Sequence, residues 1–144
     1  MAVKTWRGAW LVAAALVSAC GGVREDCERF VAVVNRGVER MRPPPRLDPK
    51  DIARIVKERR ELAKHYELLA SDVGALKLSD RKLRALAGRY GALTAEAARA
   101  LGKSADSLEQ RNHEESRKRE RRLDALSNDE RKVVKSVVGR CAAE

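Results

Sequence analysis

The sequence predicts an all-α protein, a small antiparallel helical bundle of four amphipathic helices in up-down-up-down order. Apolar residues recur at steps of three and four along four stretches of the chain, which is the spacing of one helix face. Short links join these stretches, as in bundles whose consecutive helices are antiparallel neighbours. Aromatic residues make up only 3 % of the chain. We therefore expect one domain over residues 25–144 with a core of leucine, valine and alanine.

The first helix is expected over residues 24–41, because six side chains there share one face. They are Cys27, Phe30, Val31, Val34, Val38 and Met41. The three prolines 43–45 then end the helix, since proline lacks a backbone N–H and favours an extended segment. We expect a stiff connector here, and the alternative is a proline-rich ligand for an aromatic groove.

The second helix is expected over residues 49–77. Asp48 is a good N-cap residue, and Pro49 suits the first helical position. An apolar stripe then runs from Ile52 to Leu76. Arg59 falls on this stripe where an apolar residue is expected, so the sequence predicts an open core at that level.

The third helix is expected to begin after a cap at Ser79 or Asp80 and to continue to about residue 110. It is rich in glycine and alanine, which favours close approach of a neighbouring helix. The segment Gly88–Gly91 also matches the G-x-x-G spelling of an RNA-binding loop. Its position in the middle of a helix argues against that function.

The fourth amphipathic face begins at Leu123 and ends near Cys141. No apolar residue occurs from Glu109 to Arg122, so this stretch is either a polar helical extension or a loose connector. Ser127 and Glu130 have the spacing of a capping box. A fresh helix is therefore expected to start at Ser127.

Two cysteines, Cys27 and Cys141, lie near the two ends of the predicted bundle. In up-down-up-down order, the start of the first helix and the end of the fourth meet at the same end. Each cysteine is on the apolar face of its helix, so we expect a disulfide in an oxidising compartment. Two free thiols in apolar helix faces are the alternative.

A short targeting signal precedes the bundle. Lys4 and Arg7 come before the apolar run from Ala9 to Val17, which is too short to span a bilayer but has the length of a signal-peptide core. The run ends in Leu16-Val17-Ser18-Ala19-Cys20. This ending resembles the lipobox of bacterial lipoproteins.

The lipoprotein resemblance implies that residues 1–19 are a cleaved signal peptide and that Cys20 carries the lipid. Residues 20–24 are then a lipidated tether. The protein is expected to be exported and anchored in a membrane, and Gly21, which is not the aspartate of an inner-membrane retention signal, favours the outer membrane facing the periplasm. Cleavage without lipidation and an uncleaved anchor are the alternatives.

Catalytic and cofactor-binding motifs are missing from the sequence. It has no nucleophile elbow, no phosphate-binding glycine loop and no haem signature. The two histidines, His65 and His113, lack the Glu-x-x-His spacing of a bundle metal site. We therefore expect no enzyme activity, no cofactor, no metal and no small-molecule substrate.

A basic cluster lies in the polar stretch before the fourth apolar face. Its members are Arg117, Lys118, Arg119, Arg121 and Arg122. Such clusters attract anionic lipid headgroups, or nucleic acid where it is accessible. Because export is expected, we predict a protein or an anionic envelope partner and no nucleic acid. The alternative is a solvated run whose charges are met by nearby glutamates.

Together these features predict a non-catalytic lipoprotein of the bacterial envelope that acts as a structural or interaction module. The first alternative is a periplasmic chaperone that works without ATP. The segments Leu78-Ser79 and Leu126-Ser127 resemble in part the L-T-x-x-Q repeats of one helical chaperone family, but the glutamine is absent. The second alternative is a helical protein that binds an anionic ligand.

Overall fold

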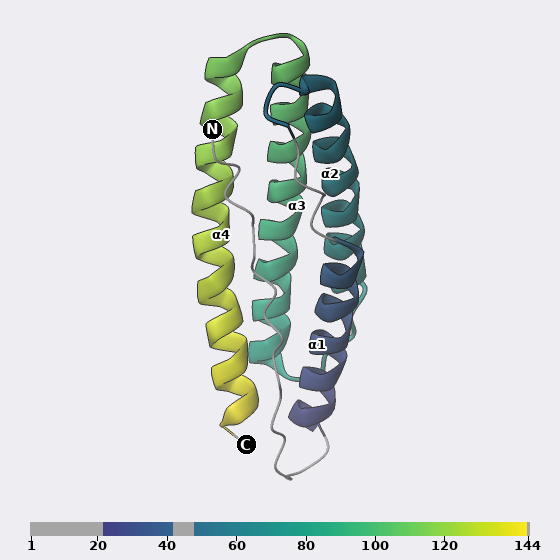
Figure 1. The fold of residues 1–144 in the computed structure, drawn as a ribbon. Helices are drawn as coiled ribbons and strands as arrows, with labels where there is room; N and C mark the ends of the chain where they lie inside the picture. Colours follow the sequence, from purple (N-terminus) through teal and green to yellow (C-terminus); the bar gives the residue numbers. More distant parts are fainter. Residues whose placement is uncertain (1–21, 42–47, 144) are drawn as a thin grey trace.

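The computed structural model describes residues 22–41 and 48–143. The described residues form four helices: α1 (Gly22–Arg40), α2 (Ile52–Gly74), α3 (Arg81–Glu109) and α4 (His113–Ala142). The helices run alternately up and down along one axis (Figure 1). The predicted all-α bundle is therefore confirmed.

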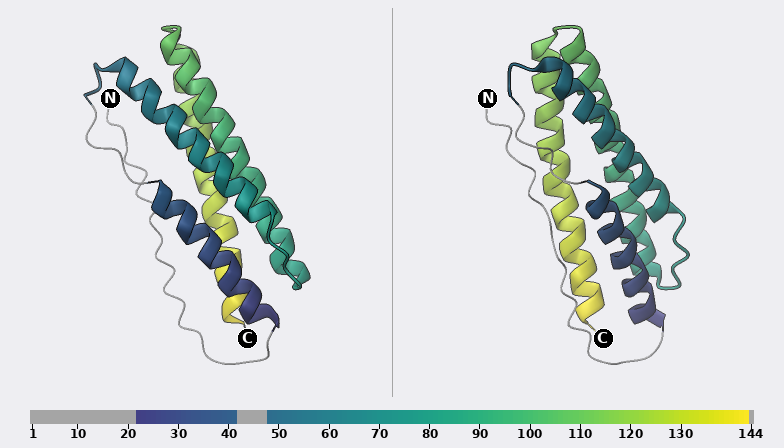
Figure 2. Two further views of the ribbon diagram at one scale, coloured as in Figure 1. Left: turned by 90° about the vertical axis from the view of Figure 1, so that its right-hand side faces the viewer. Right: turned by 45° about the vertical axis from the view of Figure 1, so that its right-hand side comes forward.

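The four helices differ in length, and this divides the bundle into two halves. α1 has 19 residues, α2 has 23, α3 has 29 and α4 has 30. Because α1 is short, it packs beside the other helices over only part of their length (Figure 2). The half that contains α1 has four helices, and the other half consists of α2, α3 and α4.

The core follows this division. In the four-helix half, the buried cluster draws on all four helices and includes Phe30, Leu69, Tyr90 and Val133. In the three-helix half, alanine makes up half of the buried cluster; its members are Ala63, Tyr66, Ala97, Ala98, Leu101 and Leu126. A last small cluster, Val56 with Ala105 and Leu108, joins α2 to α3 near the start of α2.

Two helix caps decide where α2 and α3 begin. The predicted cap at Asp48 is wrong: the N-cap of α2 is Asp51, whose side chain accepts a hydrogen bond from the backbone N–H of Arg54. The Asp48 carboxylate instead accepts from the backbone N–H of Lys50 in the preceding turn. Asp80 caps α3 by accepting from the N–H of Leu83, as one of the two predicted alternatives.

α4 is one continuous helix, so the predicted fresh start at Ser127 is wrong. Asn112 is its N-cap and accepts from the backbone N–H of Glu115 at 3.1 Å. Arg111, with a φ of 58°, turns the chain between α3 and α4. Ser127 cannot cap a helix whose preceding turns are already formed. The polar stretch before Leu123 is therefore the first part of α4.

α1 begins earlier than the sequence predicts. Its first residue is Gly22, so residues 22–24, which we expected in the tether, belong to its first turn. An acidic residue, Glu25, lies in this turn, where it interacts favourably with the positive end of the helix dipole. Any tether after Cys20 is correspondingly shorter.

Candidate functional site

The proposed lipidation site is not part of the structural description. Cys20 and the signal segment 1–19 lie outside the described residues, as do the prolines 43–45. The first described residue, Gly22, is two positions after Cys20 in the sequence. The end of the bundle where α1 begins is therefore the end nearest to Cys20 along the chain.

A disulfide joins the first and last helices at this end. Cys27 of α1 and Cys141 of α4 are bonded, with their Cα atoms 6.0 Å apart. Cys27 is buried, and the bond closes a loop across a sequence separation of 114. The predicted pair is therefore confirmed, and we call this end of the bundle the stapled end.

A buried carboxylate ties the stapled end to the link between α2 and α3. Asp26, only 1 % exposed, accepts hydrogen bonds from the backbone N–H groups of Ser79 and Asp80 at 2.6 and 2.8 Å. Buried carboxylates are costly unless they are bonded in this way. Asp26 thus fixes α1 against the beginning of α3.

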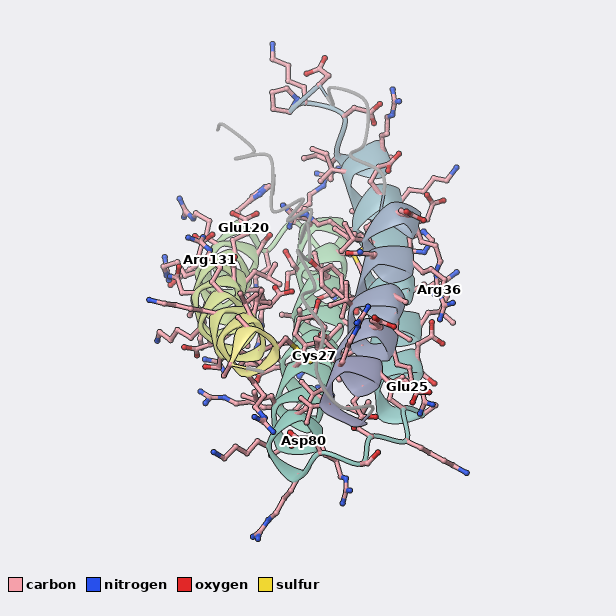
Figure 3. The ribbon with its side chains drawn as sticks, turned by 90° about the horizontal axis from the view of Figure 1, so that it is seen from below. Glu25, Cys27, Arg36, Asp80, Glu120 and Arg131 are labelled. Atoms are coloured by element: carbon pink, nitrogen blue, oxygen red, sulfur yellow. A yellow bond between two sulfur atoms is a disulfide. The ribbon has the colours of Figure 1, made fainter. Side chains whose placement is uncertain are left out.

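An ion pair joins the end of α4 to the beginning of α3 at the stapled end. Arg140 donates to Asp80 at 2.7 Å, next to the disulfide in the sequence. The hydrogen bond from Arg140, together with the backbone N–H of Leu83, lowers the pKa of Asp80 to about 2. Figure 3 looks onto this end and shows Cys27 and Asp80 on neighbouring elements. Asp26, Asp80 and Arg140 therefore reinforce the join that the disulfide makes.

Arg59 occupies the centre of a polar cluster in the three-helix half. Its guanidinium donates to the hydroxyls of Ser104 in α3 and Ser116 in α4, which also lie 3.1 Å from each other. It further donates to the Glu120 carboxylate at 2.6 Å. The predicted open core at Arg59 is wrong, because Ser104 and Ser116 are almost fully buried and supply polar partners inside the bundle.

A second polar contact, between a buried tyrosine and a half-buried glutamate, links α3 and α4. Glu130 hydrogen-bonds Tyr90, and burial raises the pKa of its carboxyl group. Tyr90 is 1 % exposed and packs edge-to-face on Phe30, with ring centroids 5.6 Å apart. Burial likewise raises the pKa of Tyr66 and of Tyr90. Both tyrosines are therefore neutral core residues at ordinary pH.

The predicted basic cluster lies on the first half of α4, away from the stapled end. The structure pairs two of its members with acids: Arg119 contacts Glu115, and Arg122 contacts Glu96 of α3. Lys118 lies 4.0 Å from Glu115. Glu120, inside the same segment, is held by Arg59. Arg117 and Arg121 are exposed and make no ion pair within the described residues.

The described residues form an open surface hollow but no cluster of side chains placed to hold a metal ion. An open hollow along the start of α2 is lined in part by Val56, Lys57 and Arg60. Arg60 is engaged there with Asp106 and Glu109. Within residues 22–41 and 48–143, no group of three or more His, Cys, Asp or Glu side chains is placed to hold a metal ion. His65 is half-buried and His113 is exposed at the start of α4.

Sequence reasoning missed Asp26 and Glu130 and misjudged Arg59. Each of the three lies on or beside the apolar stripe of its helix. A charged residue on an apolar stripe is the signal that could have identified them, since such a residue needs buried partners. Which partners those are depends on how the helices align, and the sequence does not contain that information locally.

None of the described helices combines the length and the apolar composition needed to cross a membrane. The chain matches no protein-family model, no curated protein and no solved structure.

Proposed function

We propose that this protein is a lipoprotein of the bacterial envelope that serves as a non-catalytic structural or interaction module. The observation that carries the proposal is the run Leu16–Cys20, which places a cysteine directly after an apolar segment and two small residues. The lipid on Cys20 anchors the protein, and the bundle is the part that meets other envelope components.

The disulfide supports this proposal from a separate part of the chain. Structural disulfides form and persist in oxidising compartments and are rare in the reducing cytosol. The pair Cys27–Cys141 joins the two end helices. A bundle stapled in this way suits a protein that folds after export. Arg59 and Arg122 each form polar contacts from one helix to another, which fits a structural module.

Metabolic labelling with a fatty acid tests the anchor. Wild-type protein should incorporate the label, and Cys20→Ser should not, while Cys141→Ser serves as the control that removes a cysteine without touching the lipobox. Equal labelling of wild type and Cys20→Ser would contradict the proposal. Affinity purification from intact envelopes, compared between wild type and Cys20→Ser, should then recover a partner only with the anchored form.

A further inference from the structure

The stapled end carries a group of basic residues that the structure leaves without acidic partners. We call this group the basic rim; its members are Lys77, Arg81, Lys82, Arg84 and Lys135. They come from the α2–α3 link, the first turn of α3 and the last part of α4. All five are exposed, and none forms an ion pair within the described part of the chain.

The acidic residues at the same end are engaged elsewhere. On α1, Glu25 pairs with Arg29 and Glu28 pairs with Arg24. The Asp26 carboxylate is buried against backbone N–H groups, and Asp80 is held by Arg140. The positive charge of the basic rim is therefore uncompensated, whereas three of the five members of the cluster on the first half of α4 lie close to acidic side chains.

Three rim residues lie at the start of α3, where the charge of a cation does not stabilise the helix. Arg81, Lys82 and Arg84 lie in the first turn of α3, and that turn contains no acidic residue. Cations at the positive end of a helix dipole are destabilising, and acids are the favoured residues there. Arg84 is also held in place, because its guanidinium donates to the carbonyl oxygens of Leu78 and Ser79. Such an arrangement is expected where the charge serves binding rather than stability.

The basic rim lies at the end of the bundle where α1 begins (Figure 1). The first residue of α1, Gly22, is two positions after Cys20 in the sequence. Val138, three residues after Lys135 on α4, is 44 % exposed. Outward cations beside an exposed apolar side chain suit a bilayer surface, where phosphate groups lie above the acyl chains.

We propose that the basic rim binds the phosphate groups of anionic phospholipids and holds the stapled end against the membrane surface. This inference extends the proposed function, since the lipid on Cys20 would bring the rim to that surface. Each basic residue near an anionic bilayer strengthens binding about fivefold at moderate salt. The rim then acts as a second attachment beside the lipid and fixes the orientation of the bundle.

Vesicle sedimentation tests the rim without depending on the anchor. The protein is the mature chain from residue 20 with Cys20→Ser, which contains all four helices and bears no lipid. Vesicles of phosphatidylcholine alone are compared with vesicles that also contain phosphatidylglycerol. We expect binding only to the anionic vesicles, and we expect it to weaken steeply with added sodium chloride.

Two matched triple variants locate the site. One carries Lys77→Gln, Arg81→Gln and Lys82→Gln, and the other carries Arg117→Gln, Lys118→Gln and Arg121→Gln; both remove three exposed cations. The rim variant should lose affinity for anionic vesicles by roughly 100-fold, and the α4 variant by only a few-fold. The rim variant should also melt at the same or a higher temperature than wild type, because it removes unfavourable charges from the start of α3.

Three results would overturn the inference: equal loss in both variants, equal binding of wild type to neutral and anionic vesicles, or equally tight binding of soluble polyphosphate. The first would mean that net charge alone matters, and the last would mean a general polyanion site. If the protein binds anionic vesicles but is not labelled by the fatty acid, the lipid anchor on Cys20 is contradicted and the binding role of the basic rim stands. If the protein is labelled but does not bind anionic vesicles, the anchor stands and the binding role of the basic rim is contradicted.

Discussion

Arg59 of α2 donates to Glu120 of α4 at 2.6 Å, and this contact joins two helices that lie on either side of α3. The same guanidinium also donates hydrogen bonds to the hydroxyls of two buried serines, Ser104 and Ser116. A single side chain thus connects all three helices in the half of the bundle that α1 does not cover.

Removing this side chain should destabilise the fold. Arg59→Ala leaves Glu120 without its partner and creates a void beside the serines. Because Glu120 is 44 % exposed and regains water, we expect a loss of about 1–2 kcal/mol rather than the larger cost of a fully buried charge. Urea denaturation followed by circular dichroism measures it. Arg54→Ala, an exposed position on the same helix, is the control, and equal effects of the two variants would contradict the role of Arg59.

Two glycines should respond in opposite directions to alanine. A Cβ at Gly37 would lie 2.5 Å from Cδ1 of the buried Leu69, whereas at Gly88 it would meet nothing within 4 Å. Gly37→Ala should therefore cost about 1 kcal/mol, because overpacking outweighs the gain in helix propensity. Gly88→Ala should stabilise by about 0.5–1 kcal/mol. Thermal melts of both variants check the signs, and stabilisation by Gly37→Ala would mean that Leu69 can move away freely.

The ion pair at the stapled end predicts a specific pH dependence. The pKa of Asp80 is lowered from its ordinary 3.8 to about 2 in the folded protein. The folded state therefore holds this proton less tightly than the unfolded chain. Stability from Asp80 is fully present above about pH 4 and is lost as the pH falls toward about 2. Arg140→Gln should flatten the decline in that range.

Stability measured from pH 5 downward in wild type, Arg140→Gln and Lys135→Gln tests this prediction. Lys135 is exposed on the same helix and forms no ion pair within the described residues, so its variant should follow the wild-type curve. Parallel curves for wild type and Arg140→Gln would show that Arg140 does not control the titration of Asp80.

Glu130 should show the opposite dependence. Burial raises the pKa of its carboxyl group, so the folded state binds this proton more tightly than the unfolded chain. Its contribution to stability is greatest at low pH and decreases as the pH rises through the ordinary glutamate pKa toward the raised value. Glu130→Gln keeps an acceptor for the Tyr90 hydroxyl without a buried charge. We expect a higher urea midpoint at neutral pH and a difference from wild type that shrinks in acid.

The exposed Glu114 at the start of α4 provides the comparison. Glu114→Gln removes a negative charge that is exposed to solvent and interacts favourably with the positive end of the helix dipole. This variant should therefore be as stable as wild type or slightly less stable. A Glu130→Gln variant that is less stable than wild type at neutral pH would mean that the charged carboxylate is well solvated.

The disulfide should make a large contribution to stability. In the chain-entropy description, closing a loop of this length contributes roughly 4–5 kcal/mol. Cys27→Ser with Cys141→Ser, or wild type with reductant, should therefore melt at a much lower temperature than the oxidised protein. The double variant should be insensitive to reductant. If reductant leaves the melting temperature of wild type unchanged, the bond is absent from the purified protein.

Local sequence signals were sufficient for the helices and for the disulfide. The apolar periodicity of each helix depends only on residues three or four apart, and Cys27 and Cys141 follow from that periodicity and from the topology. The sequence did not decide between a helical extension and a connector before Leu123, because Asn112 and the residues after it form a polar stretch without any apolar period. The cap of α2 was misplaced because Asp48 and Asp51 are equally good capping residues.

The polar contacts between helices could not be predicted in the same way. Arg59 and Ser116 are 57 residues apart, and Asp26 is 53 residues from Ser79. Their proximity depends on the lengthwise alignment of the helices, which is a property of the whole packed core. The sequence shows that Arg59 interrupts an apolar stripe, but the partners become evident only from the fold.

The short α1 and its disulfide have a mechanical consequence. A pulling force applied to the chain before Cys27 enters the bundle through the first turns of α1 and passes through the Cys27–Cys141 bond directly into α4. The rest of α1 is bypassed, so it cannot be peeled from the bundle by that force. A protein held at its N-terminal end would therefore bear load along its longest helix, while reduction of one bond would redirect the same load to its shortest.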